Sequence, residues 1–269
     1  ALGIASAGGS MGQFLVVPFA QQLISHLDWH AALVVLSVAV AVMLPLAPVL
    51  RGRSEHAGQG PSLSLAQSLR QALGDRSYHL LFWSFFVCGF HTAFITLHLP
   101  SYVMDRGLPA ADGAIAIALI GLFNVVGSYA CGWLGGRHSK RGLLAGLYAL
   151  RAVFILLLLL FPLTPLVLYV FAAGMGLLWL GTVPLTNGLV GQIYGLRYAA
   201  TLYGVIFFGH QIGSFIGVWL GGLAYARTGS YDPIWWAGIA LALLAAALSW
   251  PIDERPLARR AAGVARSEA

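Results

Sequence analysis

The chain has 269 residues, of which 59% are hydrophobic and only 9% are charged, and its mean hydropathy is +0.81. Because a soluble domain carries about 25% charged residues, this composition excludes a water-soluble globule and indicates an integral membrane protein. The formal net charge is +6, but the basic residues fall in short clusters between apolar runs, without the basic face that nucleic-acid binding requires.

Apolar runs of about 20 residues, the length that crosses a bilayer, occur eight times along the chain. The predicted fold is therefore an all-α membrane protein with eight transmembrane helices, at approximately residues 2–26, 30–50, 78–104, 112–135, 142–161, 165–189, 199–225 and 232–250.

Lys and Arg predict the orientation of these spans. Twelve of the 15 lie in the connectors that follow spans two, four and six, or in the tail 251–269. The positive-inside rule assigns these segments, and with them both ends of the chain, to the cytoplasm. We expect a multi-pass protein of the plasma (inner) membrane, with the lipid bilayer as its surroundings.

The first span contains "GGSMG" at 8–12, which formally matches the G-x-S-x-G elbow of hydrolases. That elbow requires a strand–turn–helix with a histidine and an acid nearby, whereas this copy lies in an apolar, helix-length run. Gln13 shares a helical stripe with Ser6 and Ser10. Polar groups on one face of a membrane helix face protein or water, so Gln13 is a candidate cavity residue.

The longest connector, 51–77, contains "LSLAQSLRQALGD", in which Leu65, Leu69 and Leu73 share one helical face. Ser62 or Ser64 is placed to cap this helix. The favoured interpretation is a short amphipathic helix lying on the membrane, and the alternative is a segment that binds a partner.

The third predicted span carries two histidines, His91 and His98, on one helical stripe. His91 is nearest the middle of the span and is a candidate for binding solute or a proton, since histidine titrates near neutral pH. The favoured interpretation of His98 is a hydrogen-bonding link between helices, and the alternative is a site for a proton or an anion. Neither this pair nor the two cysteines, Cys88 and Cys131, predicts a metal site, and no cofactor is expected.

The fourth and fifth spans contribute Asn124 and Arg151. Asn124 either lines a cavity or links helices. Arg151 lies about 15 Å from the end of its span at about 1.5 Å per residue, close to the middle of the bilayer. An unpaired arginine there costs at least about 2.5 kcal/mol, so Arg151 must find partners. The favoured interpretation is a brace between helices; attraction of an anionic solute and snorkelling to the interface are the alternatives.

The sixth span places Trp179 and Thr182 on one face, with Pro184 close by. A kink is the favoured interpretation, and the alternative is a discontinuous helix whose free backbone groups contact solute. In the seventh span His210 and Gln211 form a second candidate cavity pair.

Glycines and tryptophans complete the pattern of the last two spans. Gly213, Gly217 and Gly221 predict a close-packed helix face in the seventh span, and Trp235 and Trp236 at the start of the eighth are expected to anchor it at the membrane interface.

Three stretches resemble a known family: "GIASAGGSMGQFLVVPFAQQLISHLDWHAAL" near the start, "GWLGGRHSKR" at 132–141 and "GVWLGGLAYARTGSYDPIWW" at 217–236. They resemble, in turn, the fifth helix, the cytoplasmic loop between helices eight and nine, and the last hairpin of a major facilitator superfamily transporter. The monocarboxylate/oxalate–formate branch is the most similar. The loop motif falls on Gly132, Arg137 and Arg141, but Gly136 replaces the expected acid.

The resemblance implies that the chain is a fragment corresponding to helices five to twelve of twelve. Residues 1–50 would be the last two helices of the N-terminal bundle, 51–77 the central loop, 78–250 the six-helix C-terminal bundle and 251–269 a cytoplasmic tail. In the monocarboxylate branch the eighth helix often carries an acid and an arginine, and this chain has Asn124 and Ser128 there.

The expected function is secondary active transport of a small organic solute, a monocarboxylate-like anion, by alternating access and coupled to protons. Efflux of a neutral or amphiphilic compound is the alternative, suggested by the missing arginine of the eighth helix. Two remote alternatives are an intramembrane enzyme, with Ser10 or Ser214 beside His210, and a membrane scaffold that transports nothing.

Overall fold

The computed structural model describes residues 26–45 and 63–258, together with residues 8, 11, 12, 15, 16, 19, 20 and 22–24. Every regular element in these ranges is a helix, as predicted. The helices are α2 (Trp29–Ala41), α3 (Leu65–Leu73), α4 (Arg76–Asp105), α5 (Ala110–Leu134), α6 (Lys140–Leu160), α7 (Pro165–Leu178), α8 (Thr182–Tyr194), α9 (Ala199–Thr228) and α10 (Asp232–Ser249).

Six segments of the described ranges are long and apolar enough to cross a membrane. They are Arg76–Asp105, Ala110–Leu134, Lys140–Leu160, Pro165–Tyr194, Ala199–Thr228 and Asp232–Ser249, which confirms the last six predicted spans. The first predicted span falls largely outside the described residues. The second appears in part as α2, whose 13 residues are fewer than the about 20 that a span needs. The count of eight spans therefore stays a prediction.

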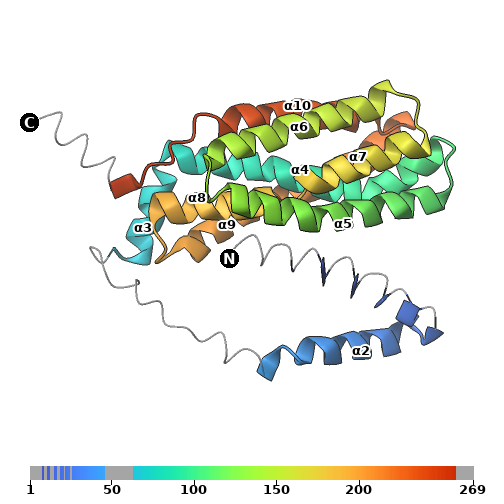
Figure 1. Ribbon diagram of the computed structural model, residues 1–269, viewed down its shortest axis with the longest axis horizontal. Helices are drawn as coiled ribbons and strands as arrows, with labels where there is room; N and C mark the ends of the chain where they lie inside the picture. The colour runs from blue at the N-terminus through green and yellow to red at the C-terminus, as the bar shows by residue number, and fades with distance from the viewer. Residues whose placement is uncertain are drawn as a thin grey trace, which may run out of the picture.

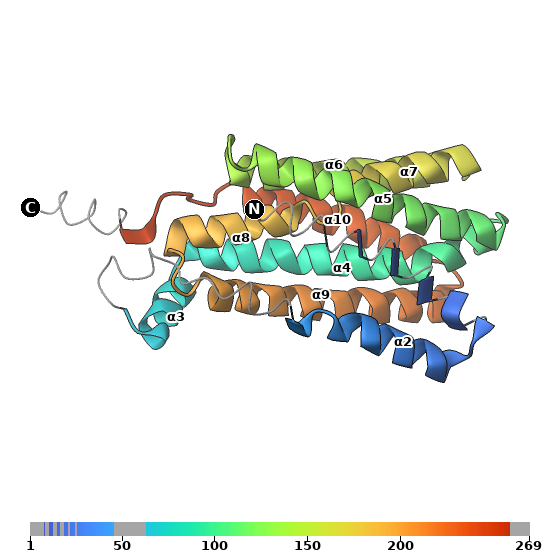
Figure 2. The same cartoon turned by 60° about the horizontal axis from the view of Figure 1, so that its bottom comes forward.

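The six spans form one bundle, in which α4 packs along α9, α5 along α7 and α6 along α10 (Figures 1 and 2). The first residues of α4, α6 and α9 and the last residues of α5, α8 and α10 lie at the same end of this bundle. We call this end the basic end, because cations gather there, among them Arg76, Arg137, Lys140, Arg141 and Arg197.

Glycines allow α4 and α9 to pack backbone to backbone. A Cβ atom on Gly213 would lie 2.0 Å from a carbonyl oxygen of α4, and one on Gly89 would lie 1.9 Å from the carbonyl oxygen of His210. Gly217 and Gly221 of α9 also face α4 at distances that exclude a Cβ atom. The predicted close-packed face of the seventh span is therefore confirmed.

The predicted helix of the long connector is α3. Ser64 is its N-cap: the Ser64 hydroxyl accepts a hydrogen bond from the backbone N–H of Gln67 at 3.2 Å, and the Gln67 side chain accepts one from the Ser64 N–H at 2.8 Å. This capping box satisfies two of the N–H groups that a helix start leaves free, which defines where α3 begins.

The prediction of interface anchors at the start of α10 is wrong for one of the two tryptophans, Trp235. Trp236 is half exposed, as an interface anchor should be, but Trp235 is only 1% exposed. Its ring packs edge-on against Phe94, Tyr102 and Phe171. Adjacent residues of a helix point in directions about 100° apart, so one of two neighbouring tryptophans can face lipid while the other fills the core.

Candidate functional site

The sixth span is two helices, not one kinked helix. α7 ends at Leu178 and α8 begins at Thr182, so the favoured kink is wrong and the alternative, a break, is what the chain forms. Pro184 explains the position, because it has no N–H to donate to the carbonyl of Leu180 four residues earlier. That carbonyl accepts from the N–H of Val183 at 3.0 Å instead.

Arg151 of α6 fills the carbonyl side of this break. Its side chain is 0% exposed. Nε donates to the carbonyl of Leu178 at 3.2 Å, and Nη2 donates to the same carbonyl at 2.7 Å and to the carbonyl of Trp179. The ring of Tyr148 lies 5.2 Å from the guanidinium carbon. The cation therefore sits at the C-terminal end of α7, where the helix dipole is negative.

Asn124 of α5 holds the amide side of the same break. Its Oδ1 atom accepts from the backbone N–H of Leu180 at 3.0 Å and from the hydroxyl of Ser128 at 3.1 Å. Both side chains are 0% exposed. Two neighbouring helices thus supply the partners that the unwound residues lack.

On the α4 side, the polar groups of the break meet Cys88. The Cys88 sulfur lies 3.2 Å from the hydroxyl oxygen of Thr182, the first residue of α8, and 3.7 Å from Nη2 of Arg151. The ring of His210 in α9 lies 5.0 Å from the ring of Phe85 in α4. Neither ring nitrogen of His210, nor Nη1 of Arg151, makes a hydrogen bond of normal geometry to the described residues.

The two histidines of α4 point at different neighbours. His91 is 1% exposed, and its Nε2 atom bonds the carbonyl of Gly238 in α10 at 2.9 Å. His98 is half-buried, and its Nε2 atom bonds the carbonyl of Val218 in α9 at 3.1 Å. The structure thus places His91, the favoured solute ligand of the pair, inside the bundle against α10.

The remaining predicted contacts differ in burial. Trp179 and Thr182 lie at the break and are buried, His210 is half-buried, and Gln211 beside it is exposed. His210 and Gln211, although adjacent in α9, therefore lie in different surroundings. Gln13 lies outside the described residues.

Ser214, one of the two serines considered for an intramembrane enzyme, does not bond the imidazole of His210. Its hydroxyl donates to the backbone carbonyls of His210 at 3.0 Å and Gly89 at 3.3 Å. Ser10 lies outside the described residues. The Ser214 hydroxyl thus finds its hydrogen-bond partners on the backbones of α9 and α4, and it lacks the contact with a general base that an activated nucleophile has.

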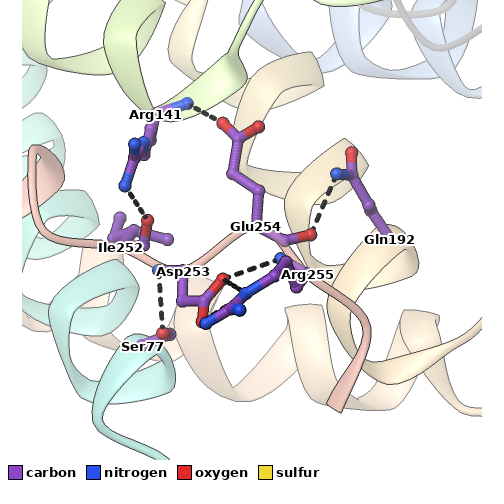
Figure 3. A network of polar contacts seen from close by, with 7 residues as sticks. All are labelled: Ser77, Arg141, Gln192, Ile252, Asp253, Glu254 and Arg255. Carbon is purple, nitrogen blue, oxygen red and sulfur yellow. Dashed lines mark hydrogen bonds and ion pairs between the residues drawn. The ribbon is translucent and has the colours of Figure 1, made fainter. Parts of the chain in front are cut away.

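At the basic end, the loop motif contacts the segment that follows α10 (Figure 3). Arg141 donates from Nη1 to the carbonyl of Ile252 at 3.0 Å and from its backbone N–H to Glu254 at 2.6 Å. The guanidinium carbon of Arg137 lies 3.9 Å from the centre of the Trp133 ring. Gly132, the first residue of the motif, is half-buried near the end of α5.

Glu254 is a contact residue that the sequence analysis missed. Its carboxylate also accepts from the hydroxyl of Ser139 at 3.0 Å, and its carbonyl accepts from Gln192 of α8 at 2.9 Å. The acid absent at Gly136 is thus replaced near the start of α6 by one more than a hundred residues later in the chain. The signal available in the sequence was the pair of acids directly after the last apolar run.

Comparison with known proteins identifies the family. The model of the Major Facilitator Superfamily matches residues 1–218. An uncharacterized MFS-type transporter of Bacillus subtilis, YcxA, is 26% identical over 246 residues, which cover 86% of this chain and 58% of that protein. Monocarboxylate transporter 12-B of Danio rerio is 26% identical over 282 residues, which cover 90% of this chain and 58% of that protein. The chain thus spans 58% of the length of these relatives.

Among solved structures, the E. coli fucose:proton symporter FucP has the same fold. One FucP structure superposes with a TM-score of 0.67 at 17% identity, covering 92% of this chain and 68% of that one. A second, in the outward conformation, gives a TM-score of 0.68 at 18% identity, covering 92% and 67%. Both the matched family model, which covers most of the residues, and this shared fold lead to one conclusion: the chain is a multi-pass membrane protein that belongs to the Major Facilitator Superfamily.

Proposed function

We propose that this chain is the helix-five-to-twelve part of a secondary transporter that moves a small monocarboxylate-like anion by alternating access. In this proposal residues 1–50 complete the N-terminal bundle, 51–77 connect the halves, 78–250 form the C-terminal bundle and 251–269 are a tail. The basic end faces the cytoplasm of a plasma (inner) membrane.

The observation that carries the proposal is the position of Arg151. A positive charge is held at the middle of a span, at a helix break, and all acids of the described ranges lie at or beyond the ends of the spans. In a medium of low dielectric constant an uncompensated charge acts over a longer distance than in water. Such a cation attracts anions into the protein.

In this proposal, solute reaches the charge of Arg151 from the side of α9. Gln211 is exposed and His210 is half-buried, so solute meets these side chains first, while Asn124, Trp179 and Thr182 shape the wall behind them. A broken helix beside the binding site is a recurring arrangement in transporters. The names of relatives such as monocarboxylate transporter 12-B support the proposal that the solute is an anion.

Proton coupling is part of the proposal, and the name of the fucose:proton symporter FucP agrees with it. The deep histidines His91 and His210 are the first candidates for carrying the proton. Replacing both with glutamine should remove the dependence of uptake on an imposed pH gradient. If the double variant kept this dependence, the histidines would have no part in coupling.

A second candidate function is efflux of a neutral or amphiphilic compound. It is favoured by one observation: Arg151 is fully buried and donates to two backbone carbonyls, so its guanidinium is not displayed on the face that Gln211 opens. In this alternative Arg151 only braces the break.

Counterflow in proteoliposomes separates the two functions. The full natural chain, preloaded with unlabelled solute, is expected to accumulate labelled lactate-like acids, and His210→Ala is expected to weaken this uptake several-fold. His98→Gln serves as the matched control, because His98 bonds a carbonyl of α9 farther along α4. Counterflow of hydrophobic amphiphiles, with no counterflow of the lactate-like acids, would overturn the proposal of an anionic solute and support efflux.

A further inference from the structure

The charge of Arg151 has no carboxylate partner in the described part of the chain. Its hydrogen bonds go to backbone carbonyls, which are neutral dipoles, and Nη1 has no partner among the described residues. Removing a guanidinium from water without an opposite charge costs several kcal/mol. A buried arginine is therefore stabilised by an anionic group close to it.

The Cys88 sulfur lies next to both the guanidinium of Arg151 and a hydroxyl group of the helix break. Nη2 of Arg151 is 3.7 Å from the sulfur, and the hydroxyl oxygen of Thr182 is 3.2 Å from it. Thr182 is also the first residue of α8, so the positive end of that helix lies beside the sulfur. A neighbouring arginine and a helix N-terminus are the surroundings that stabilise a thiolate in proteins.

The other ionisable groups near Cys88 do not compete for this role. Tyr148 of α6 and Tyr203 of α9 carry phenol groups, whose ordinary pKa of about 10 lies above the value of about 8.5 for a thiol. The packed helices α5 and α10 carry acids only in their first turns, as Asp112 and Asp232, at the end opposite the basic end. The second thiol, Cys131 of α5, lies beside Gly181 of the same break but makes no hydrogen bond to Arg151 or Thr182. Among the described residues, Cys88 is thus the acid placed to balance Arg151.

We propose that Cys88 is the anionic partner of Arg151: its sulfur is a thiolate that forms an ion pair with the guanidinium inside the bundle, and a proton binds reversibly to this sulfur. The step is balanced as RS⁻ + H⁺ → RSH. No other bond forms or breaks, and no oxidant is involved. Protonation leaves Arg151 without its counter-charge.

This inference deepens the proposed function and, for transport, rests on it. When Cys88 binds a proton, the charge of Arg151 becomes available to an anionic solute, so a proton and a monocarboxylate would bind together.

The ionisation of Cys88 is measurable by infrared spectroscopy, because the S–H stretching band lies where other protein groups absorb little. Measured against a variant that lacks both cysteines, Cys88→Ala/Cys131→Ala, the Cys131→Ala protein is expected to show no additional S–H band at neutral pH and a band that appears on acidification. The matched control is Cys88→Ala, which keeps Cys131, a second buried cysteine, on α5. This control should show the band at neutral pH.

The unsubstituted protein provides a further check: measured against the same variant, Cys88 and Cys131 together should contribute the S–H intensity of one thiol at neutral pH. Equal bands in the Cys131→Ala and Cys88→Ala proteins, or intensity for both thiols in the unsubstituted one, would overturn the ion pair.

Transport provides a separate measurement. Cys88→Ser, whose hydroxyl does not ionise near neutral pH, should lose the pH dependence of uptake, while Cys131→Ser should keep it; unchanged pH dependence in Cys88→Ser would overturn the coupling role. The infrared result is independent of transport, so the predicted spectra in a protein that moves no monocarboxylate would refute the proposed solute and leave the ion pair standing.

Discussion

Arg151 is the side chain on which the geometry of the helix break most depends. The guanidinium is planar and carries several N–H donors in fixed directions, so one side chain reaches two consecutive carbonyls. Those carbonyls, of Leu178 and Trp179, have no other described donor at the end of α7. The arginine thus serves a structural purpose whatever its part in attracting solute.

Arg151→Met is expected to lower the free energy of unfolding by about 3 kcal/mol, since each unsatisfied buried carbonyl costs about 1–3 kcal/mol. Arg151→Lys keeps a charge and donors for one carbonyl and should lose less. Thermal unfolding of detergent-purified protein measures both. Leu150→Met, at the neighbouring position of α6 that is 48% exposed, is the control and should be near neutral. A Met variant as stable as wild type would show that the break does not need the guanidinium.

At the scale of residues, the sequence predicted well which polar residues are buried. It predicted less well which groups these residues contact. An arginine in an apolar run must find partners, and Arg151 does. The identity of those partners depends on which neighbour faces the side chain, and hydropathy contains no such information. Cys88 and Cys131 look alike in sequence, each in an apolar run, yet only the sulfur of Cys88 lies beside Thr182 and Arg151. Trp235 and Trp236 differ for the same reason.

At the scale of elements, helix pairs are set by how closely two backbones approach. Gly213→Ala would place a Cβ atom 2.0 Å from a carbonyl oxygen of α4, and no side-chain rotation relieves a clash with backbone. We expect the pair α4–α9 to be forced apart, at a cost of about 3 kcal/mol or more. The measurement is thermal stability together with the yield of monodisperse protein.

Gly204→Ala, on the same helix, is the matched control. A Cβ atom there meets no atom within 4 Å, and alanine favours helix over glycine by up to about 1 kcal/mol. This variant should be as stable as wild type or slightly more stable. If both alanine variants behaved alike, close backbone packing would not be what holds α4 against α9.

The six spans were predictable because length and hydropathy determine them, whereas the break between α7 and α8 was not. The run 165–189 is apolar throughout, and Pro184 is equally compatible with a kink and with a break. The choice depends on side chains from other helices, Arg151 and Asn124, which satisfy the unwound backbone. Long-range partners of this kind have no local signal in sequence.

At the basic end of the molecule, the segment that follows α10 is hydrogen-bonded to α6 and α8. Glu254 places a carboxylate at the N-terminus of α6, where the helix dipole is positive. Glu254→Ala should loosen this contact by about 1 kcal/mol and speed hydrogen exchange of the Arg141 and Gly142 amides. Arg255→Ala is the control, because the ion pair of Arg255 with Asp253 is largely exposed and worth less than about 1 kcal/mol. Unchanged exchange in Glu254→Ala would contradict a role for this acid.

Orientation in the membrane is the property of the whole molecule that the Lys and Arg pattern predicts and that labelling decides. Cys88 and Cys131 are buried, so neither should react appreciably with a membrane-impermeant maleimide. A cysteine at the exposed position His138, at the basic end, should react only in inside-out vesicles. One at the exposed position Ala110, at the opposite end, should react only in right-side-out vesicles. The reverse pattern would place the basic end outside, and with it the segment around Glu254, against the positive-inside rule.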